Sequence, residues 1–573
     1  MKKIYQIFLV LFFIFIYLIP ISQYILLSAT IYIFILLTFI YIIYFKLALF
    51  SKISIYTIFI VFILLANNII QGNKYGINFY YVSSLLWLLL VLLLIAFQNR
   101  EIVFLVAKLF IISLFLELCL SFLQSIRLIR NSIELYPFSG SFGNIGSYGL
   151  FLGAVLPMTL AIALFYKKKK VYENFFYFSI FTFLWGMGML IFSKSRTGII
   201  GCSIGCIYVL SHFYNYKDVL KKYFFSKYII LFVVLGLSIT LFYLKKDSSF
   251  GRLLVWKITI QNMNNNILTG NSIGFFDASY GKWQSNYFLL NEGTKEEKYL
   301  ADYVTSTYNE FLNFFIENGV VFTILFITLM IILIFKKNSK ISILYIAFKG
   351  SLLSIFFLML FSNPFEVIPL FFYIVFCIAA IVTFFPTHKF KVKIVSLQMI
   401  LSLLIMFFCF NGIKNLYGYH LMEKGIFFFV NNKKQKSLMY HTKAHKIIPN
   451  NAMCNYYLGA TNYYDNNYIK AMFFLKKATE KSSNPDYMIF LGKVYFDLSL
   501  YKESEETLIK AINIQPNRLN PRYILFKNYI NKKEFKKACA LSKSILEIKE
   551  KRKTEIGDSI KREVFLFSKK NCF

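Results

Sequence analysis

Cysteine and histidine are scarce in this sequence, and neither forms a recognisable metal or disulfide pattern. The chain of 573 residues has eight cysteines and five histidines. Cys202 and Cys206 would share one face of a helix, but no histidine or carboxylate beside them completes a metal site. Cys454, Cys539 and Cys572 lack the spacing of a disulfide framework. We therefore expect no metal centre and no cofactor.

Acidic residues are few, and a signal-peptide cleavage site and a nucleic-acid-binding motif are lacking. Lys and Arg total 63 against 28 Asp and Glu, which gives a formal net charge of +35. In a soluble protein such a charge would suggest nucleic acid, but no recognition module is present, so we expect no nucleic-acid partner. No small-residue cleavage site follows the first apolar run, and a second run begins almost at once. We therefore expect the first run to be a retained membrane span.

Apolar sequence dominates instead. Hydrophobic residues make up 58% of the chain and aromatic residues 20%, with a mean hydropathy of +0.58. A helix needs about 20 apolar residues to cross a bilayer, and runs of this length recur along the chain. The sequence therefore predicts an all-α, polytopic membrane bundle of roughly thirteen spans. The predicted spans are 4–22, 24–45, 54–71, 81–97, 103–126, 147–166, 176–193, 197–213, 227–244, 314–335, 341–362, 365–385 and 394–411.

Lysine and arginine in the gaps between spans predict the topology. They gather before the first span and after every second span, and basic loops mark the cytoplasmic side. The N-terminus is then inside and the C-terminus outside, in a bacterial inner membrane. The predicted domains are a membrane core at 1–411, which includes an outer loop at 245–313, and a periplasmic domain at 412–573.

The predicted periplasmic domain shows an internal repeat. Several residue types recur about 34 residues apart, which is the tetratricopeptide period. Such arrays form α-solenoids that present binding surfaces, so we expect this domain to bind a protein partner. A degenerate earlier repeat ends at Ala444 and Pro449. The recurring columns are Leu458-Gly459, Leu491-Gly492 and Leu525-Phe526; Tyr468, Tyr501 and Phe535; Ala471, Ser504 and Ala538; and Ala478 with Ala511, with Pro516 closing the second repeat.

Four polar stretches adjoin the predicted outer ends of spans. Arg196 precedes a span, where a guanidinium fork and a helix N-terminus would together match a phosphate group. Glu310 and Glu317 are seven residues apart and would share one helix face. Inside the spans, Lys108, Glu117 and Lys349 are expected to face the protein interior. The four stretches are Gly140–Gly146, Ser193–Gly198, Gly251–Lys257 and Ser306–Val320.

In this order, the four stretches resemble the O-antigen ligase superfamily. Its members often carry a GTFGNPN-like segment, an SRTG motif, a GRxxxW motif at the start of a large periplasmic loop, and an HNxxLxxxxExG sequence at its end. The corresponding sequences here are GSFGNIG at 140–146, SRTG at 195–198, GRLLVW at 251–256, and Tyr308-Asn309-Glu310 through Glu317-Asn318-Gly319. The resemblance covers roughly residues 130–385, and some family members also have a tetratricopeptide tail.

The resemblance implies a lipid-linked glycan transferase. The donor would be a polyprenyl-diphosphate-linked glycan, and the acceptor a hydroxyl group on a glycolipid or a protein. Arg196 and Arg252 would bind the leaving diphosphate without a metal ion, and one displacement would invert the anomeric carbon. Ser195, Gly251, Glu317 and Gly319 would support this site.

The sequence departs from the family pattern at Tyr308, where family members usually have histidine. A tyrosine hydroxyl, with a pKa of about 10 in water, is a poor base at neutral pH. We therefore expect Glu310 to act as the base, with Tyr308 orienting the acceptor and Asn309 fixing the turn into the next span. A chain that has lost activity and serves as an assembly scaffold is the alternative.

Three roles within the family differ only in their acceptor: ligase, polymerase and protein O-oligosaccharyltransferase. A polyprenyl-glycan flippase or transporter is the alternative from another class. That function would predict charged residues through the middle of many spans, whereas the polar stretches here gather at one predicted membrane face.

Overall fold

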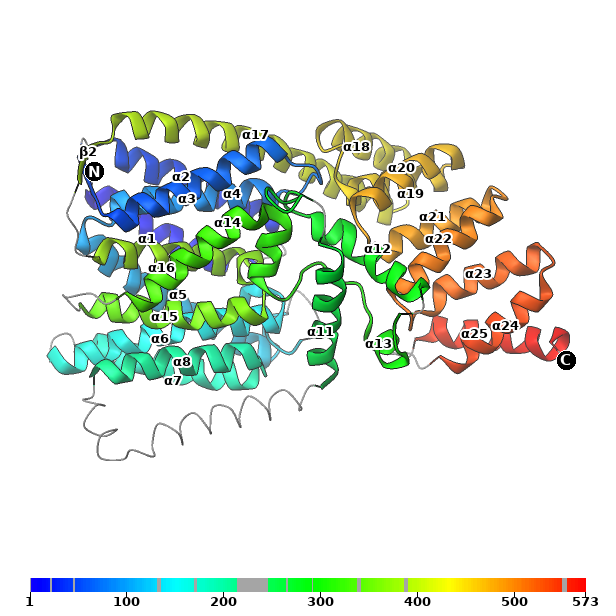
Figure 1. Cartoon of the computed structure of the whole chain (residues 1–573), viewed down its shortest axis with the longest axis horizontal. Helices are drawn as coiled ribbons and strands as arrows, with labels where there is room; N and C mark the ends of the chain where they lie inside the picture. Colours follow the sequence, from blue (N-terminus) through cyan, green and yellow to red (C-terminus); the bar gives the residue numbers. More distant parts are fainter. Residues whose placement is uncertain are drawn as a thin grey trace. The chain divides into compact units, whose positions relative to one another are not determined.

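The computed structural model describes residues 2–20, 23–44, 47–130, 136–169, 173–213, 246–263, 266–290, 292–336, 342–385, 390–548 and 554–572 (Figure 1). The predicted span at 227–244 lies outside them. The chain forms two compact units. The first comprises Met1–Ile70, Asn78–Leu244 and Tyr308–Ile413, and the second comprises Gln71–Ile77, Lys245–Thr307 and Lys414–Phe573.

The first unit is a bundle of apolar helices (Figure 1). Its helices are α1 (Lys2–Leu18), α2 (Tyr24–Ile43), α3 (Lys52–Gln71), α4 (Phe79–Ala96), α5 (Arg100–Ser125), α6 (Ile145–Lys169), α7 (Glu173–Phe192), α8 (Arg196–Phe213), α14 (Glu310–Phe335), α15 (Ile343–Phe361), α16 (Ile368–Phe384) and the first part of α17 (Val395–Val430), with 3₁₀ turns η1 (Gly140–Phe142) and η2 (Pro364–Glu366). Each predicted span that falls on described residues coincides with one of these helices.

Nine helices in the described part of the chain are long and apolar enough to cross a membrane. The shorter α16 is apolar and buried along almost its whole length, as is α4. A helix that is hydrophobic on all faces belongs in the interior of a bundle, which accounts for the position of these two helices. The fold is therefore a multi-span helical bundle, while its full span count and its orientation stay predictions.

One two-stranded ribbon departs from the expected all-α fold. Strand β1 (Leu47–Phe50) pairs in antiparallel register with β2 (Phe390–Lys393). Both strands lie in gaps between predicted spans, where the backbone amides and carbonyls have no helix to satisfy them. Pairing the two gaps supplies those hydrogen bonds.

Helices α6 and α8 approach each other through glycine. A Cβ atom at Gly153 would lie 2.6 Å from the Gly198 carbonyl oxygen, and one at Gly198 would collide with the Gly149 carbonyl oxygen. These contacts leave no room for a side chain at either position. Gly198 of the SRTG sequence therefore has a packing role, whatever its neighbours do.

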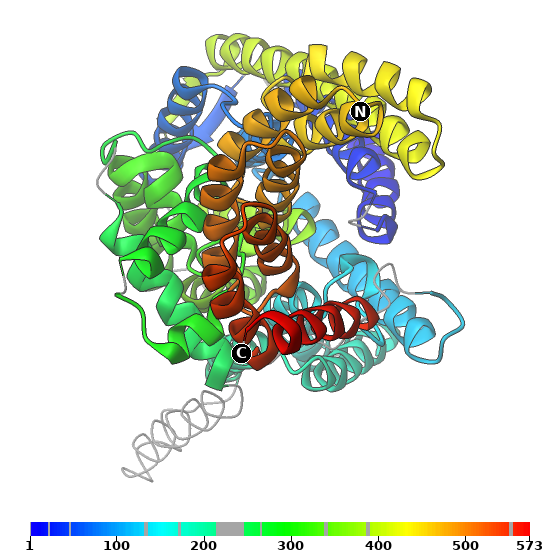
Figure 2. The same ribbon diagram turned by 90° about the vertical axis from the view of Figure 1, so that its right-hand side faces the viewer.

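The second unit contains three outer-loop helices and a series of antiparallel helix pairs (Figure 2). The loop helices are α11 (Lys246–Gln261), α12 (Phe275–Leu289) and α13 (Lys295–Leu300). The remaining helices are the end of α17, α18 (Lys434–Ile447), α19 (Ala452–Tyr464), α20 (Tyr468–Lys481), α21 (Pro485–Asp497), α22 (Tyr501–Ile514), α23 (Leu519–Asn531), α24 (Phe535–Glu547) and α25 (Glu555–Asn571).

The predicted repeat columns occupy equivalent positions in these pairs. The column of aromatic residues begins the second helix of each pair, and the small residues Ala471, Ser504 and Ala538 are fully buried. Glycine follows leucine where the two helices of a pair cross, because a Cβ atom at Gly459 would lie 2.8 Å from Leu475 Cγ. This arrangement confirms a tetratricopeptide-like α-solenoid.

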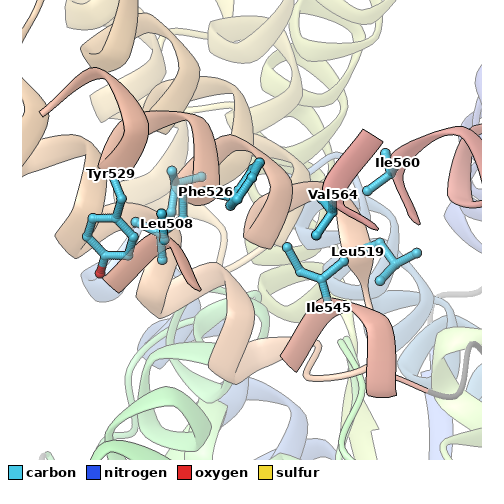
Figure 3. Packing of buried hydrophobic residues seen from close by; sticks show 9 residues of the cluster. Leu508, Leu519, Phe526, Tyr529, Ile545, Ile560 and Val564 are labelled. Carbon is cyan, nitrogen blue, oxygen red and sulfur yellow. The ribbon is translucent and has the colours of Figure 1, made fainter. Parts of the chain in front are cut away.

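The third repeat differs because α25 covers it. Phe526 replaces the glycine of the column and packs edge-to-face on Phe567 of α25, with ring centroids 4.9 Å apart. Ile560 and Val564 of α25 join the same buried cluster (Figure 3). A disulfide between Cys539 and Cys572 links α24 to the end of α25, although the cysteine spacing alone indicates no such pair.

Replacing Gly198 with alanine should destabilise the membrane bundle. The new methyl group would force α6 and α8 apart, at a cost of about 1–3 kcal/mol for overpacking. Gly188, on α7, has no atom within 4 Å of the position a Cβ would take. We expect Gly188→Ala to be neutral or mildly stabilising. Thermal unfolding of the full chain in detergent measures both, and an equal melting temperature for Gly198→Ala and wild type would contradict the packing role.

Candidate functional site

The sequence GSFGN, at residues 140–144, is held by two side chains of α5. Glu117 is fully buried, and its carboxylate accepts hydrogen bonds from the Ser141 amide at 3.0 Å and the Ser141 hydroxyl at 2.5 Å. Gln124 accepts from the amides of Ser139 and Gly140 at 2.9 and 2.8 Å. Gly140 has a φ of +58° and would bring any Cβ into contact with Glu117. The intramembrane glutamate therefore orders this loop.

The SRTG sequence, at residues 195–198, spans the end of the turn between α7 and α8 and the first residues of α8. Lys194 takes a left-handed conformation with φ of +52°, and the Ser193 hydroxyl donates to the Leu190 carbonyl at 2.6 Å. Arg196 is the first residue of α8 and is half-buried. The residue that carries the guanidinium group therefore stands at a helix N-terminus, where the backbone amides of the first turn also favour an anion.

The stretch Tyr308–Glu310 is tied to the connection between α15 and α16. Tyr308 is left-handed, with φ of +55°. Asn309 caps α14: its Oδ1 accepts from the Leu312 amide at 3.0 Å, while its Nδ2 donates to the Leu360 carbonyl at 3.0 Å. The Glu310 side chain is 1% exposed and accepts from the Phe365 amide at 3.2 Å. Asn309 therefore fixes the turn into α14, as the sequence predicts.

Glu310 and Glu317 share one buried face of α14, as their spacing predicts. Asn313 donates to Glu317 at 3.4 Å, and Glu317 lies within electrostatic range of Glu310. Two residues later Gly319 breaks the helix, with φ of 84° and ψ of 170°. Because a residue with a side chain rarely adopts this conformation, Gly319 permits the kink that separates the two glutamates from the apolar part of α14.

Gly251 and Arg252 lie on α11 in the second unit. Trp256, four residues after Arg252, donates its indole N–H to the Thr307 carbonyl at 2.7 Å. Thr307 immediately precedes Tyr308 in the chain. The GRLLVW helix is therefore bonded to the second residue of the last polar stretch.

Lys257 joins α11 to the rest of the outer loop. Its ammonium group donates to the Tyr287 hydroxyl at 2.6 Å and to Glu297 at 3.0 Å. Hydrogen bonds with Tyr287 and Glu297 raise the pKa of Lys257. The same glutamate closes a capping box with Thr294 at the start of α13. Three separate helices of the loop therefore share one polar cluster.

The outer loop docks on the repeat helices. Gly281 lies against Ser483, whose hydroxyl accepts from the Gly281 amide at 3.1 Å and donates to the Asp277 carbonyl at 2.5 Å. Gln284 is buried and donates to the Ile514 carbonyl at 2.8 Å. Tyr303 donates to the Asp277 carboxylate, and burial raises the pKa of Asp277.

These bonds join residues 277–303 to the turns that follow α20 and α22. The expected division of the chain placed the outer loop with the membrane core. In the structure, residues 245–307 pack with the tail instead, because their buried polar groups find partners on the repeats.

Two histidines that follow the last predicted span, His441 and His445, lie in the second unit. His441 is fully buried in the second unit between Ser437 and Thr461, and burial lowers its pKa to about 4. His445 is on the same helix, α18. Within the described residues, no group of three or more His, Cys, Asp or Glu side chains could hold a metal ion.

Comparison with known families identifies the polar stretches. Residues 181–327 match the sequence model described as O-antigen ligase. This segment forms a domain similar to the O-antigen ligase family. The matched segment contains the SRTG sequence, the GRLLVW helix and the Tyr308–Gly319 stretch, whereas GSFGN and the repeats lie outside it. The family supports glycan transfer of the ligase or polymerase type.

A search of curated proteins found no match. Similar solved structures include YrrB, "a TPR protein with an unusual peptide-binding site", at 17% identity over 26% of this chain and 76% of that one, with a TM-score of 0.22. "MamA MSR-1 C2" is 14% identical over 27% of this chain and 89% of that one, with a TM-score of 0.23. The "APC/C hetero-tetramer Cut9-Hcn1" is 10% identical over 84% of this chain and 76% of that one, with a TM-score of 0.24.

The predicted site residues of this O-antigen ligase-like domain are distributed over both units. Arg196, Ser195 and the Tyr308–Gly319 residues belong to the first unit, and Gly251 and Arg252 belong to the second. α14 brings Glu310 and Glu317 together. The meeting of Arg196 with Arg252 stays a prediction.

Sequence reasoning placed Glu117 in the protein interior without assigning its partner, and it missed the other residues that hold these elements in place. Glu117 and Gln124 are polar residues within a predicted span, and this position indicates a buried side chain that binds another segment of the chain. Gln284 and Ser483 gave no such signal, since each is an ordinary polar residue about 200 positions from its partner.

Replacing Gln284 with alanine should loosen the outer loop. The change removes the donor to Ile514 and leaves the buried Tyr280 hydroxyl without its 2.8 Å acceptor. Loss of buried partners costs about 1–3 kcal/mol, so we expect protease to cleave within residues 246–307 roughly tenfold faster. Asn286→Ala is the control, because Asn286 is exposed on the same helix. Equal cleavage rates for the two variants would argue against docking through Gln284.

Proposed function

We propose that the chain transfers a glycan from a polyprenyl-diphosphate donor to an acceptor hydroxyl at the outer face of the bacterial inner membrane. The match of residues 181–327 to the O-antigen ligase family carries this proposal. The helical bundle and the placement of polar stretches at helix ends support it, since a lipid-linked donor presents its head group at the membrane surface.

The intramembrane charges favour a transferase over a flippase or transporter. Glu117 is bound to the GSFGN loop. Lys349 donates to the Lys336 carbonyl at 3.2 Å and to the Tyr345 hydroxyl at 2.9 Å. Both charges have structural partners, whereas a proton or ion path needs polar groups that continue through the bundle.

Arg196 and Arg252 would stabilise the leaving diphosphate. Departure of the donor lipid leaves negative charge on the diphosphate oxygens, and guanidinium groups form paired hydrogen bonds with such oxygens. In the proposed step the acceptor oxygen bonds to the anomeric carbon as the bond to the diphosphate oxygen breaks. The configuration inverts, the acceptor proton passes to a base, and no metal ion takes part.

Glu310 is the proposed base, and Tyr308 orients the acceptor hydroxyl. Glu310 stands at the first turn of α14, directly after the capping Asn309. The Phe365 amide uses one lone pair of Glu310 Oε2, so the other lone pairs of the carboxylate remain to accept a proton. Glu317 and Gly319 lie further along α14 and are proposed to support the site.

The acceptor distinguishes a ligase, a polymerase and a protein O-oligosaccharyltransferase, and the family match is common to all three.

A protein partner for the repeats is part of the proposal. Since residues 277–303 of this chain already occupy the edge formed by the turns after α20 and α22, such a partner would use another face of the array. A non-catalytic assembly scaffold is the alternative if Tyr308 has cost the chain its activity.

The tail is proposed to be periplasmic. The disulfide between Cys539 and Cys572 supports this location, because disulfides persist in oxidising compartments such as the periplasm and are rare in the cytosol.

Arg196→Ala and Arg252→Ala should each slow glycan transfer by about two to three orders of magnitude. Removing one donor to a developing oxyanion costs about 2.7–4 kcal/mol in enzymes of comparable chemistry. Lysine should rescue poorly, since it keeps the charge and loses the planar fork. The measurement is the transfer rate with the native lipid-linked donor in membranes. Normal transfer by Arg196→Ala would exclude its role at the diphosphate.

Glu310→Gln should abolish transfer, whereas Tyr308→Phe should reduce it only several-fold. The glutamine oxygen can still accept the Phe365 amide, so this variant removes the base and keeps the structural hydrogen bond. Tyr308→His, which restores the family residue, should be tolerated or raise the rate. The transfer rate and the melting temperature are measured together. A fully active Glu310→Gln protein would disprove the base assignment.

A further inference from the structure

The end of the repeat array contains a cavity outside the predicted site. It has a volume of about 800 Å³ and lies wholly within the second unit. Three segments form its walls: Ala301 and Asp302 of the outer loop, the turn and first residues of α23, and the first turn of α25. The cavity is therefore shared by the outer loop, the third repeat and the helix that caps the array.

Hydrogen bonds between these segments hold the walls in place. Gln515 donates to the Asp302 carboxylate at 2.6 Å, and Asn517 donates to the Tyr299 carbonyl at 2.8 Å. Arg518 forms an ion pair with Asp486 at 2.5 Å and donates to Gln515 at 3.1 Å. A cavity whose polar rim is fixed in this way is organised before a ligand arrives.

The lining combines an apolar floor with a rim of polar groups, most of which are uncharged. Leu519 and Ile560 belong to the buried cluster that joins α25 to the third repeat (Figure 3). Asn520 supplies an amide, the Asn517 amide oxygen can accept a hydrogen bond while its NH2 group donates to Tyr299, and the Thr554 hydroxyl can donate while it accepts from the Gly557 amide. Sugar rings need this combination, because their hydroxyl groups both donate and accept while their C–H faces are apolar.

We propose that this cavity binds a sugar segment of the glycan that the protein transfers or extends. An anionic ligand fits less well, because the one guanidinium group in the lining is paired with Asp486 and the Asp302 carboxylate faces the same space. An extended peptide fits less well, because such ligands run along several repeats and this cavity is confined to the third repeat and its cap.

The proposal rests on the proposed glycan-transfer function and adds a subsite to it. Asp302 lies six residues before Tyr308 in the chain. The polypeptide segment that carries one wall of the cavity thus continues directly into the predicted acceptor site. A glycan bound in the cavity would be retained between successive encounters with that site, which increases its effective concentration there.

Binding of oligosaccharide to the full chain in lipid nanodiscs tests the proposal. The probe is the oligosaccharide released by mild acid from the polyprenyl-linked glycan of the host cell, titrated by calorimetry. Asn520→Trp would fill the cavity from its exposed rim, and Asn520→Ala would remove one amide without filling it. Met453→Trp is the matched control, because Met453 is the exposed second residue of α19, equivalent to Asn520 on α23.

We expect the Kd to rise at least tenfold in Asn520→Trp and severalfold in Asn520→Ala, and to be unchanged in Met453→Trp. Unaltered binding by Asn520→Trp, no binding by wild type, or binding of a Ser/Thr-rich peptide in place of the oligosaccharide would overturn the proposal. Arg196→Ala separates the two levels of inference. If Arg196→Ala binds the probe normally but does not transfer glycan, both the cavity proposal and the transfer mechanism stand. If Arg196→Ala transfers glycan normally while Asn520→Trp still loses binding of the probe, only the transfer mechanism fails.

Discussion

The docking of the outer loop on the repeat helices is the interaction on which the functional arrangement depends. Residues 277–303 bury their polar groups against the turns that follow α20 and α22, with Gln284 and Ser483 at the centre. The same loop carries Arg252 on α11 and ends at Thr307, which the Trp256 indole holds. A repeat domain usually presents its surface to other proteins. Here one edge of the array serves the chain's own loop.

Buried polar residues perform a comparable role in the membrane bundle. Glu117 and Gln124 hold the GSFGN loop, and Asn309 joins the start of α14 to the end of α15. An unpaired polar group in an apolar bundle is costly, so each of these side chains specifies one position for the loop it binds. Loops at helix ends are thereby given a defined geometry, as a site for positioned chemistry requires.

The elements of the fold could be predicted from the sequence because their signals are local. Apolar runs of span length and the 34-residue columns of Leu458, Leu491 and Leu525 are periodic patterns that a single sequence displays. The site could be predicted only in part. The shared face of Glu310 and Glu317 follows from helical spacing, but the kink at Gly319 depends on packing around it.

Contacts between distant residues could not be predicted. Ser483 and Gly281 are 202 positions apart and neither belongs to a motif. The disulfide partners Cys539 and Cys572 are 33 residues apart, close to one repeat, yet the sequence does not say that α25 folds back onto α24. The β1–β2 ribbon pairs two segments that lie between predicted spans and are more than 300 residues apart, and neither segment alone shows that it has a partner.

Profiling of lipid-linked glycans in cells tests the central claim most directly. A strain whose own copy carries Arg196→Ala should accumulate the intact polyprenyl-diphosphate glycan, and the corresponding glycan on the acceptor should disappear. The accumulated species would also identify the acceptor class, since a ligase leaves finished chains on the lipid and a polymerase leaves single units. An unchanged glycolipid profile, with the variant protein folded and present in the membrane, would contradict glycan transfer by this chain.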